Sequence, residues 1–279
     1  MKILTLGSTG VMGSAIKKAC MERDIEHIGL SHTDLEVTNP LDMENAVSAH
    51  NPDAVINCVV FMGINPCEEN PDKAYAVNAT AVLNLAKICA RKDIILVQPS
   101  SHAVFDGTKD DYYTEDDPPI ITGTYSGSKY LSERFAADMC PRHYITRFPT
   151  IFGKRRNSVP GFVDKVTERM MKGLPLRIAD DKIDSPTYSA DAAEAVLYLL
   201  MNENECGVYH IANYGKVSYY DFVTKLKEAL GADAQIDRAK DADFPALGYK
   251  PLKTAMKSIK LPPLRTWQDA LEEYIQEID

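Results

Sequence analysis

The sequence predicts an α/β protein with a doubly wound parallel sheet and a second, smaller lobe. In the first half of the chain, short apolar runs alternate with helical patterns. The runs are continuously apolar instead of alternating with polar residues, which is typical of strands buried on both faces. A glycine-rich turn from Gly7 to Gly13 joins the first apolar run to the first helical pattern. These observations favour parallel strands whose connecting helices cover both faces of one sheet.

Strands and helices are expected to alternate through this first half. The expected strands are Ile3–Leu6, His27–Leu30, Ala54–Asn57, Ile94–Val97 and Tyr144–Arg147. The expected helices are Val11–Met21, Leu41–His50, Tyr75–Arg91 and Tyr125–Met139. The third helix carries Ala79, Val82 and Ala86 on one stripe, which suits packing against a sheet. The fourth ends near Pro141, which cannot continue a helix.

The pattern becomes looser after residue 150. Expected elements are the helices Phe162–Lys172, Asp191–Met201, Tyr219–Leu230 and one from Trp267, with strands Leu176–Ile178 and Val208–Ile211. Gly173 and Gly231 end two of these helices. We therefore expect a sheet domain over 1–150 and a smaller lobe over 151–279, with a segment of about 176–214 returning to the sheet domain.

Composition excludes several classes of function. The 279 residues include 31 Lys and Arg against 40 Asp and Glu, a net charge of −9. Such an acidic surface argues against nucleic-acid or anionic-membrane partners. No apolar run is long enough to span a bilayer, and Met1-Lys2 lead directly into a strand, so we expect no signal peptide and a cytoplasmic protein. The six cysteines form no C-x-x-C pair and have no histidine cluster nearby, so no metal is expected.

The glycine-rich turn predicts a dinucleotide site of the Rossmann type. Its glycines allow a tight turn and a close backbone approach to a pyrophosphate, and the following helix presents its amino end there. The second strand ends in Ser31-His32, where NAD sites usually carry an acid. Because both side chains can hydrogen-bond a 2′-phosphate, we favour NADP(H). Asp34 and Glu36 lie close enough to leave NAD(H) open.

A tyrosine and a lysine four residues apart begin the helix over 125–139. Tyr125 and Lys129 therefore share one helix face, and the ammonium is expected to lower the pKa of the phenol. Ser101 follows the fourth strand. A ketone that accepts hydride develops negative charge on its oxygen, so a hydroxyl donor and a proton source should converge there. Ser101, Tyr125 and Lys129 are the predicted catalytic residues.

Further stretches, in collinear order, give the chain a resemblance to the extended short-chain dehydrogenase/reductases and, within them, to the dTDP-4-dehydrorhamnose reductases. The similar stretches are 57–80 ("NAAAYT…VD.AE…A..VNA"), 100–107 ("STDYVFDG"), 147–153 ("RTSWVYG"), 180–187 ("DDQ.GSPT") and 207–213 ("GIYH.AN"). The resemblance covers nearly the whole chain. It implies NAD(P)H-dependent reduction of the 4-keto group of a nucleotide-activated 6-deoxy sugar, and it leaves a homodimer open.

The resemblance also implies roles for single residues. Tyr125 protonates the carbonyl oxygen, Lys129 also binds the nicotinamide ribose, and Ser101 binds the substrate carbonyl. The expected cofactor-binding residues are Gly7, Thr9, Gly10, Val11, Met12, Gly13, Ser31, His32, Glu36, Val37, Cys58, Val59, Val60, Asn78, Ser100, Tyr125, Lys129, Phe148 and Pro149. The expected substrate-binding residues are Ser101, His102, Ala103, Tyr125, Thr150 and Lys182. For Asn78, a helix-surface amide is the alternative.

The chain departs from the family's pattern at several positions. His102-Ala103 replace Asp-Tyr, Thr150 replaces Trp, and Lys182 and Asp184 replace Gln and Gly. These changes predict a different sugar, stereochemistry or carrier nucleotide. Since related dehydratases carry an acid pair directly after the Ser/Thr position, His102-Ala103 also favour reduction over water elimination.

Charged residues elsewhere have two interpretations. Candidates for holding the diphosphate are Arg155, Arg156, Lys182 and Lys250, which could equally be solvated surface. The acidic runs Asp110-Asp111 and Glu115–Asp117 are interpreted as a solvated loop edge, on a loop able to cover the site. Two other functions stay open: a non-catalytic subunit that keeps the dinucleotide site, and an epimerase that uses bound NAD as a transient oxidant.

Overall fold

A six-stranded parallel sheet forms the centre of the larger domain in the computed structural model, which describes residues 1–155, 160–202 and 204–278. Its strands are β1 (Lys2–Leu6), β2 (Glu26–Leu30), β3 (Ala54–Asn57), β4 (Ile95–Ser101), β5 (His143–Phe148) and β10 (Gly207–His210). Their spatial order is β10-β5-β4-β3-β1-β2, and all neighbours are parallel. The predicted doubly wound sheet is confirmed. The winding reverses between β1 and β3, which is where open α/β sheets bind ligands.

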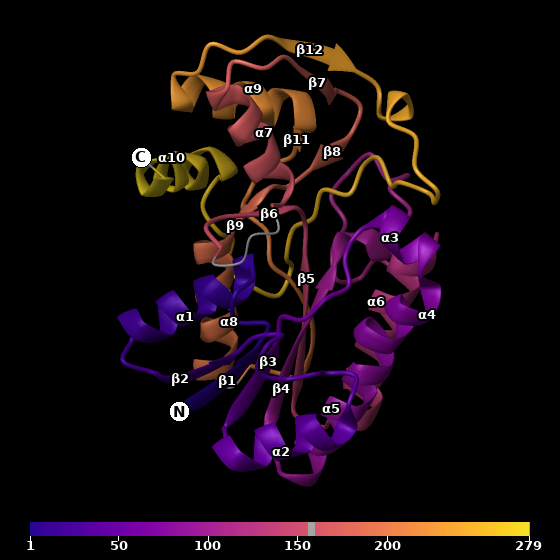
Figure 1. Cartoon of the computed structure of the whole chain (residues 1–279), viewed down its shortest axis with the longest axis vertical. Coiled ribbons are helices and arrows are strands. Elements are labelled where there is room, and N and C mark those ends of the chain that lie inside the picture. The colour runs from indigo at the N-terminus through magenta and orange to yellow at the C-terminus, as the bar shows by residue number, and fades with distance from the viewer. Residues whose placement is uncertain (156–159, 203, 279) are drawn as a thin grey trace.

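Helices cover both faces of this sheet (Figure 1). One face carries α1 (Val11–Glu22) and α8 (Ser189–Met201), and the other carries α2 (Pro40–His50), α5 (Ala81–Arg91) and α6 (Thr124–Met139). Successive strand residues serve opposite faces, so Ile3 packs with the α1 side and Leu4 with the α2 side. In the described part of the chain, no helix has the length and apolar character that a membrane crossing requires.

The smaller lobe lies beyond the carboxyl ends of the strands (Figure 1). Its helices are α7 (Phe162–Met171), α9 (Tyr219–Leu230) and α10 (Trp267–Ile278). Its strands pair in twos: β6 (Ile151–Phe152) with β9 (Thr187–Tyr188), β7 (Leu176–Ala179) with β12 (Ile236–Ala239), and β8 (Ile183–Asp184) with β11 (Val217–Ser218). Its core contains the buried aromatic residues Phe152, Tyr188, Phe222, Trp267 and Tyr274.

Three features differ from the expected elements. Strand β4 extends to Ser101 instead of ending at 97, so Ser100-Ser101 belong to the strand. The helix expected over 75–91 is preceded by α3 (Ile64–Glu69) and begins as α4 (Pro71–Tyr75), which runs through a π-helical turn (Ala76–Thr80) into α5. Within 176–214, α8 and β10 lie with the sheet, whereas β7, β8 and β9 lie in the lobe.

Candidate active site

The end of β4 and the first turn of α6 bring two hydroxyl groups together. Ser101 is the last residue of β4, and Tyr125 lies in the first turn of α6. The two hydroxyl groups are close enough that the Ser101 hydroxyl lowers the pKa of the Tyr125 phenol. The Ser101 hydroxyl also accepts a hydrogen bond of 3.1 Å from the Ala103 amide. This hydrogen bond caps a short 3₁₀ turn over 102–104. Two hydroxyl donors therefore meet at one point, as polarisation of a carbonyl oxygen requires.

The Tyr125 phenol is a weak acid in this structure. Burial raises its pKa to about 12, and the nearby Ser101 hydroxyl lowers it by less. The predicted lowering of this pKa is therefore wrong, because desolvation of the phenolate outweighs the favourable contacts. A phenol with this pKa holds its proton at neutral pH, so it can act as a proton donor.

Lys129 is buried one helical turn beyond Tyr125. The side chain is 3% exposed, and its ammonium donates a hydrogen bond of 2.7 Å to the Pro99 carbonyl. Burial lowers the Lys129 pKa to about 8, against the opposing effect of the nearby Glu133 and Cys58. The lysine is therefore charged at neutral pH but close to its titration.

A buried ion pair supports this part of α6. Glu133 accepts hydrogen bonds from Arg147 of β5, at 2.9 Å from Nε and 2.7 Å from Nη2. Both side chains are 4% exposed. The Ser100 hydroxyl donates to the same carboxylate at 2.5 Å. Ser100, expected at the cofactor, thus directs its hydroxyl to Glu133, and only its backbone is left for that role.

Asn78 lies in the π-helical turn and is 1% exposed. Its Oδ1 accepts from the Phe61 amide at 2.8 Å, and its Nδ2 donates to the Phe61 carbonyl at 2.9 Å and to Ser128 Oγ at 3.0 Å. The alternative of a helix-surface amide is therefore wrong. Asn78 instead ties the loop after β3 to the helix that carries Tyr125. Single π-helical turns inside α-helices are frequent at functional sites.

The residues at the first strand–helix turn leave room for a dinucleotide. Gly7 has a φ of +75°, and a Cβ on it would lie 3.0 Å from the Cys58 backbone. A Cβ on Gly13 would lie 2.4 Å from the Gly7 carbonyl oxygen. Gly10 is the N-cap of α1 and has no side chain to occupy the amide groups of the first turn. The turn therefore fits a pyrophosphate at a helix amino end.

A cavity of about 180 Å³ continues from this turn. The predicted cofactor residues that line it are Gly7, Ser31, His32, Glu36, Val37 and Val59. Its remaining lining residues, Leu6, Leu30, Leu35 and Val77, were missed. Leu6 and Leu30 are the last residues of β1 and β2. Their position at the carboxyl end of a strand was the sequence signal that could have identified them as cavity residues. A pocket with apolar walls and a polar rim suits an adenosine group.

The other predicted cofactor residues lie along the same edge. Thr9 and Gly10 lead into α1, whose first turn holds Val11, Met12 and Gly13. Cys58, Val59 and Val60 follow β3, while Phe148 ends β5 and the buried Pro149 follows it. Among the described residues, no group of three or more His, Cys, Asp or Glu side chains is placed to hold a metal ion.

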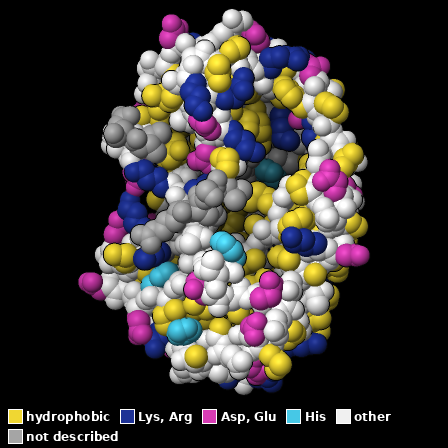
Figure 2. Space-filling view, in the orientation of Figure 1, with side chains coloured by type: hydrophobic (Ala, Val, Ile, Leu, Met, Phe, Trp, Pro, Cys, Tyr) yellow, Lys and Arg dark blue, Asp and Glu magenta, His cyan; other side chains and the backbone are white. Residues whose placement is uncertain are grey.

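The predicted substrate residues face the smaller lobe. Figure 2 shows the molecule hollowed between lobe and sheet domain, with Lys and Arg side chains around the upper part of the hollow. His102 Nδ1 lies 3.2 Å from Asp184 Oδ1, and the Thr150 amide donates to Asp184 Oδ2 at 2.9 Å. Ala103 follows His102 in the 3₁₀ turn. Lys182 lies 3.8 Å from Asp241.

The candidate diphosphate ligands are paired with acids. Arg155 lies 2.8 Å from Asp164, and Lys250 lies 2.6 Å from Asp241. Arg156 lies outside the described residues. A diphosphate would therefore have to compete with these carboxylates for Arg155, Lys182 and Lys250.

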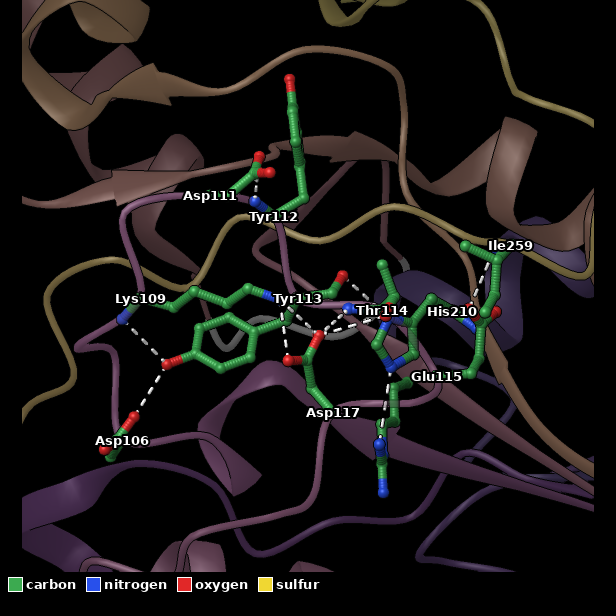
Figure 3. Close-up of polar contacts among 11 residues, drawn as sticks. Asp106, Lys109, Asp111, Tyr112, Tyr113, Thr114, Glu115, Asp117, His210 and Ile259 are labelled. Carbon is green, nitrogen blue, oxygen red and sulfur yellow. Dashed lines mark hydrogen bonds and ion pairs between the residues drawn. The ribbon is translucent and has the colours of Figure 1, made fainter.

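The loop over 106–117 is held in place by its acids (Figure 3). Glu115 accepts from the His210 amide of β10 at 2.8 Å and from the Ile259 amide at 2.9 Å. Asp117 accepts two hydrogen bonds of 2.7 Å from the Lys109 ammonium. The interpretation of Glu115 and Asp117 as a solvated edge is therefore wrong: backbone amides and a lysine converge on them. Asp110, Asp111 and Asp116 are exposed, as expected.

Comparisons with known proteins agree with this geometry. The pattern of the RmlD substrate binding domain family matches residues 1–279. The dTDP-4-dehydrorhamnose reductase of Mycobacterium tuberculosis is 30% identical over 283 residues, covering 97% of this chain and 91% of that protein. A dTDP-4-dehydrorhamnose reductase ortholog from Clostridium acetobutylicum superposes with a TM-score of 0.94 at 29% identity, covering 100% of this chain and 99% of that one.

A dTDP-4-dehydrorhamnose reductase from Bacillus anthracis, solved with NADP, has the same fold, with a TM-score of 0.93 at 23% identity over 99% of this chain and 100% of that one. The predicted resemblance to the extended short-chain dehydrogenase/reductases, which are NAD(P)-dependent oxidoreductases, is confirmed. By its match over the whole length, the chain belongs to the RmlD substrate binding domain family.

Proposed function

We propose that this protein reduces the 4-keto group of a nucleotide-activated 6-deoxy sugar with NAD(P)H. The observation that carries the proposal is the convergence of the Ser101 hydroxyl at the end of β4 with the Tyr125 hydroxyl in the first turn of α6, one helical turn from the buried Lys129. Relatives named dTDP-4-dehydrorhamnose reductase support the substrate class.

Each of the three side chains has a distinct task. NAD(P)H, held by the glycine turn and the cavity at Ser31 and His32, supplies the hydride. The Ser101 hydroxyl donates a hydrogen bond to the ketone oxygen. The Tyr125 hydroxyl gives its proton to the same oxygen as the carbonyl becomes an alcohol. The Lys129 ammonium, charged below about pH 8, stabilises the phenolate that remains, and solvent then returns a proton to Tyr125.

The direct test follows loss of nicotinamide absorbance with a panel of nucleotide 4-keto-6-deoxy sugars. We expect the wild type to turn over at least one member, and Tyr125→Phe to lower kcat by roughly 10²- to 10⁴-fold with an unchanged melting temperature. Turnover of no member would overturn the proposal. NADPH binding without turnover would then favour the non-catalytic subunit, and tightly bound NAD without net consumption would favour the epimerase.

For the cofactor, we propose a preference for NADP(H), with NAD(H) as the alternative. Ser31 and His32 line the cavity and do not repel a 2′-phosphate, whereas the Glu36 carboxylate lines the same cavity. Glu36→Gln is expected to raise the NADPH-to-NADH ratio of kcat/KM by about threefold to tenfold, since it removes one repulsive charge near the surface. A wild-type preference for NADH would contradict the proposal.

A further inference from the structure

Four positions at which the chain departs from the family's pattern lie in one connected group. They are His102 after β4, Thr150 between β5 and β6, and Lys182 and Asp184 at β8. We call these four residues together with Tyr219 of α9 the sugar-side cluster. The cluster joins residues far apart in sequence, since His102 and Asp184 are 82 positions apart.

Asp184 is the centre of the sugar-side cluster. It is 1% exposed, and its carboxylate accepts hydrogen bonds from His102 Nδ1 at 3.2 Å, from the Thr150 amide at 2.9 Å and from the Ser185 amide at 2.9 Å. Burial acts to raise the Asp184 pKa, but the contacts with His102 and Thr150 outweigh it and lower that pKa. The carboxylate is therefore charged, and both of its oxygens accept hydrogen bonds from the protein.

Tyr219 connects the remaining members. Its hydroxyl lies 2.7 Å from Thr150 Oγ1, and its amide donates to the Lys182 carbonyl at 2.9 Å. The Lys182 ammonium lies 5.4 Å from the Tyr219 ring centroid. The departures are thus in contact with one another: Thr150 and Lys182 both contact Tyr219, and Asp184 is hydrogen-bonded to His102.

The hydrogen bond to Asp184 determines how His102 presents its ring. With Nδ1–H donating to the carboxylate, a neutral imidazole keeps a free electron pair on Nε2, which can only accept. In the described part of the chain, no hydrogen bond engages Nε2. The His102 side chain is 17% exposed, against 2% for Asp184, and it directly follows Ser101. A single acceptor is therefore partly open on the residue that follows Ser101 in the chain.

We propose that His102, oriented by Asp184, accepts a hydrogen bond from the sugar hydroxyl on the ring carbon next to the ketone, and that the sugar-side cluster selects substrates as one unit. This inference rests on the proposed ketone reduction. In a 4-keto-6-deoxy sugar, one neighbouring carbon carries the methyl group, so the hydroxyl concerned is the one at C3. A sugar that lacks it would leave the buried pair of His102 and Asp184 without its ligand.

The test compares two nucleotide 4-keto-6-deoxy sugars that differ only in the 3-hydroxyl. His102→Asn keeps a donor near the Nδ1 position for Asp184 but removes the Nε2 acceptor. We expect the wild type to favour the hydroxylated sugar in kcat/KM by about tenfold or more, the worth of a hydrogen bond, and His102→Asn to reduce this ratio to about twofold. His143→Asn is the matched control, because His143 bonds the Cys140 carbonyl through Nδ1 at the other end of the sheet.

The ratio of kcat/KM for the two sugars separates substrate recognition from a purely structural role. A purely structural role of His102 would lower kcat/KM for both sugars equally. An unchanged ratio in His102→Asn would overturn the inference and leave the reductase proposal intact. If the wild type reduces neither of these two sugars nor any other member of the panel, the reductase proposal fails. Calorimetric binding of the corresponding pair of nucleotide 6-deoxyhexoses then decides: a preference that His102→Asn removes supports the inference, and equal or absent binding overturns it.

A second experiment tests the dependence between positions 102 and 184. His102→Asp places two carboxylates against each other and should lower the melting temperature and kcat/KM. The double variant His102→Asp/Asp184→Asn should regain part of both, because an amide at 184 can donate to the carboxylate at 102 although it no longer accepts from the Ser185 amide. Asp184→Asn alone completes the cycle. Additive effects would show that the two positions act independently and would overturn the single-unit part of the inference.

Discussion

The sheet edge formed by the carboxyl ends of the strands and the sugar-side cluster are built in different ways. At the sheet edge, site residues end strands or begin helices, so the backbone positions them: Ser101 ends β4, and Tyr125 and Lys129 begin α6. In the sugar-side cluster, side chains contact one another over long sequence separations: Thr150 and Tyr219, for example, are 69 positions apart. The first arrangement depends on where the backbone of the sheet and of α6 places each residue. The second depends on contacts between side chains, which a single substitution can remove.

The largest expected effect comes from breaking the support beneath the sheet edge. Arg147→Met leaves Glu133 buried, and among the described residues the Ser100 hydroxyl is then its remaining hydrogen-bond donor. Removing one member of a buried pair should lower the free energy of unfolding by about 3–5 kcal/mol, measured in urea.

The control for this variant lies on α6, the helix that carries Glu133. Arg134 pairs with Asp138 at 2.7 Å, but the two side chains are 52% and 48% exposed. Arg134→Met should change the free energy of unfolding by less than about 0.5 kcal/mol. Similar losses in both variants would contradict the special role of the buried pair.

A smaller effect should appear at Lys129, with a distinct pH dependence. Its folded pKa of about 8 lies below the usual 10.5, so the folded state binds fewer protons than the unfolded state between these values. Wild-type stability should therefore rise with pH across this window. Lys129→Met removes a cost on the order of 3 kcal/mol at pH 7, partly offset by the lost bond to Pro99.

The measurement is urea unfolding of both proteins without cofactor at pH 7 and pH 9.5. Lys129→Met should be the more stable protein at pH 7, and its advantage should shrink at pH 9.5. An advantage independent of pH would show that the buried lysine is not the source. Reductase activity should be lost at both pH values.

The smallest effect should come from the lobe side. Tyr219→Phe removes the hydroxyl bonded to Thr150, which should cost about 1 kcal/mol of stability and raise KM severalfold with kcat nearly unchanged. Tyr220→Phe is the control, because the Tyr220 ring stacks on Arg238 at 4.0 Å and keeps that contact. A fall in kcat as large as that of Tyr125→Phe would remove the distinction between the two regions.

Sequence patterns predicted the sheet edge better than the lobe, for a physical reason. Strand runs, a glycine turn and the spacing of Tyr125 and Lys129 are local features, and a parallel sheet brings its strand ends together. The contacts of His102 with Asp184 and of Glu115 with His210 join residues 82 and 95 positions apart. The pKa of Tyr125 was mispredicted because burial depends on packing that periodicity does not contain. Asn78 was placed on the right helix, but its π-helical turn has no signal in the apolar pattern.

The contact between Glu115 and His210 also protects the sheet. Strand β10 lies at one border, where backbone groups facing away from β5 lack a neighbouring strand. Glu115 accepts from the His210 amide at 2.8 Å, and the Lys260 ammonium donates to the Val208 carbonyl at 3.1 Å. Val208 and His210 are two residues apart on β10. The Val208 carbonyl and the His210 amide therefore point to the same side of the strand, the side without a neighbouring strand. A carboxylate and an ammonium thus occupy the bonding positions that a strand from another molecule would need, which guards this border against edge-to-edge aggregation.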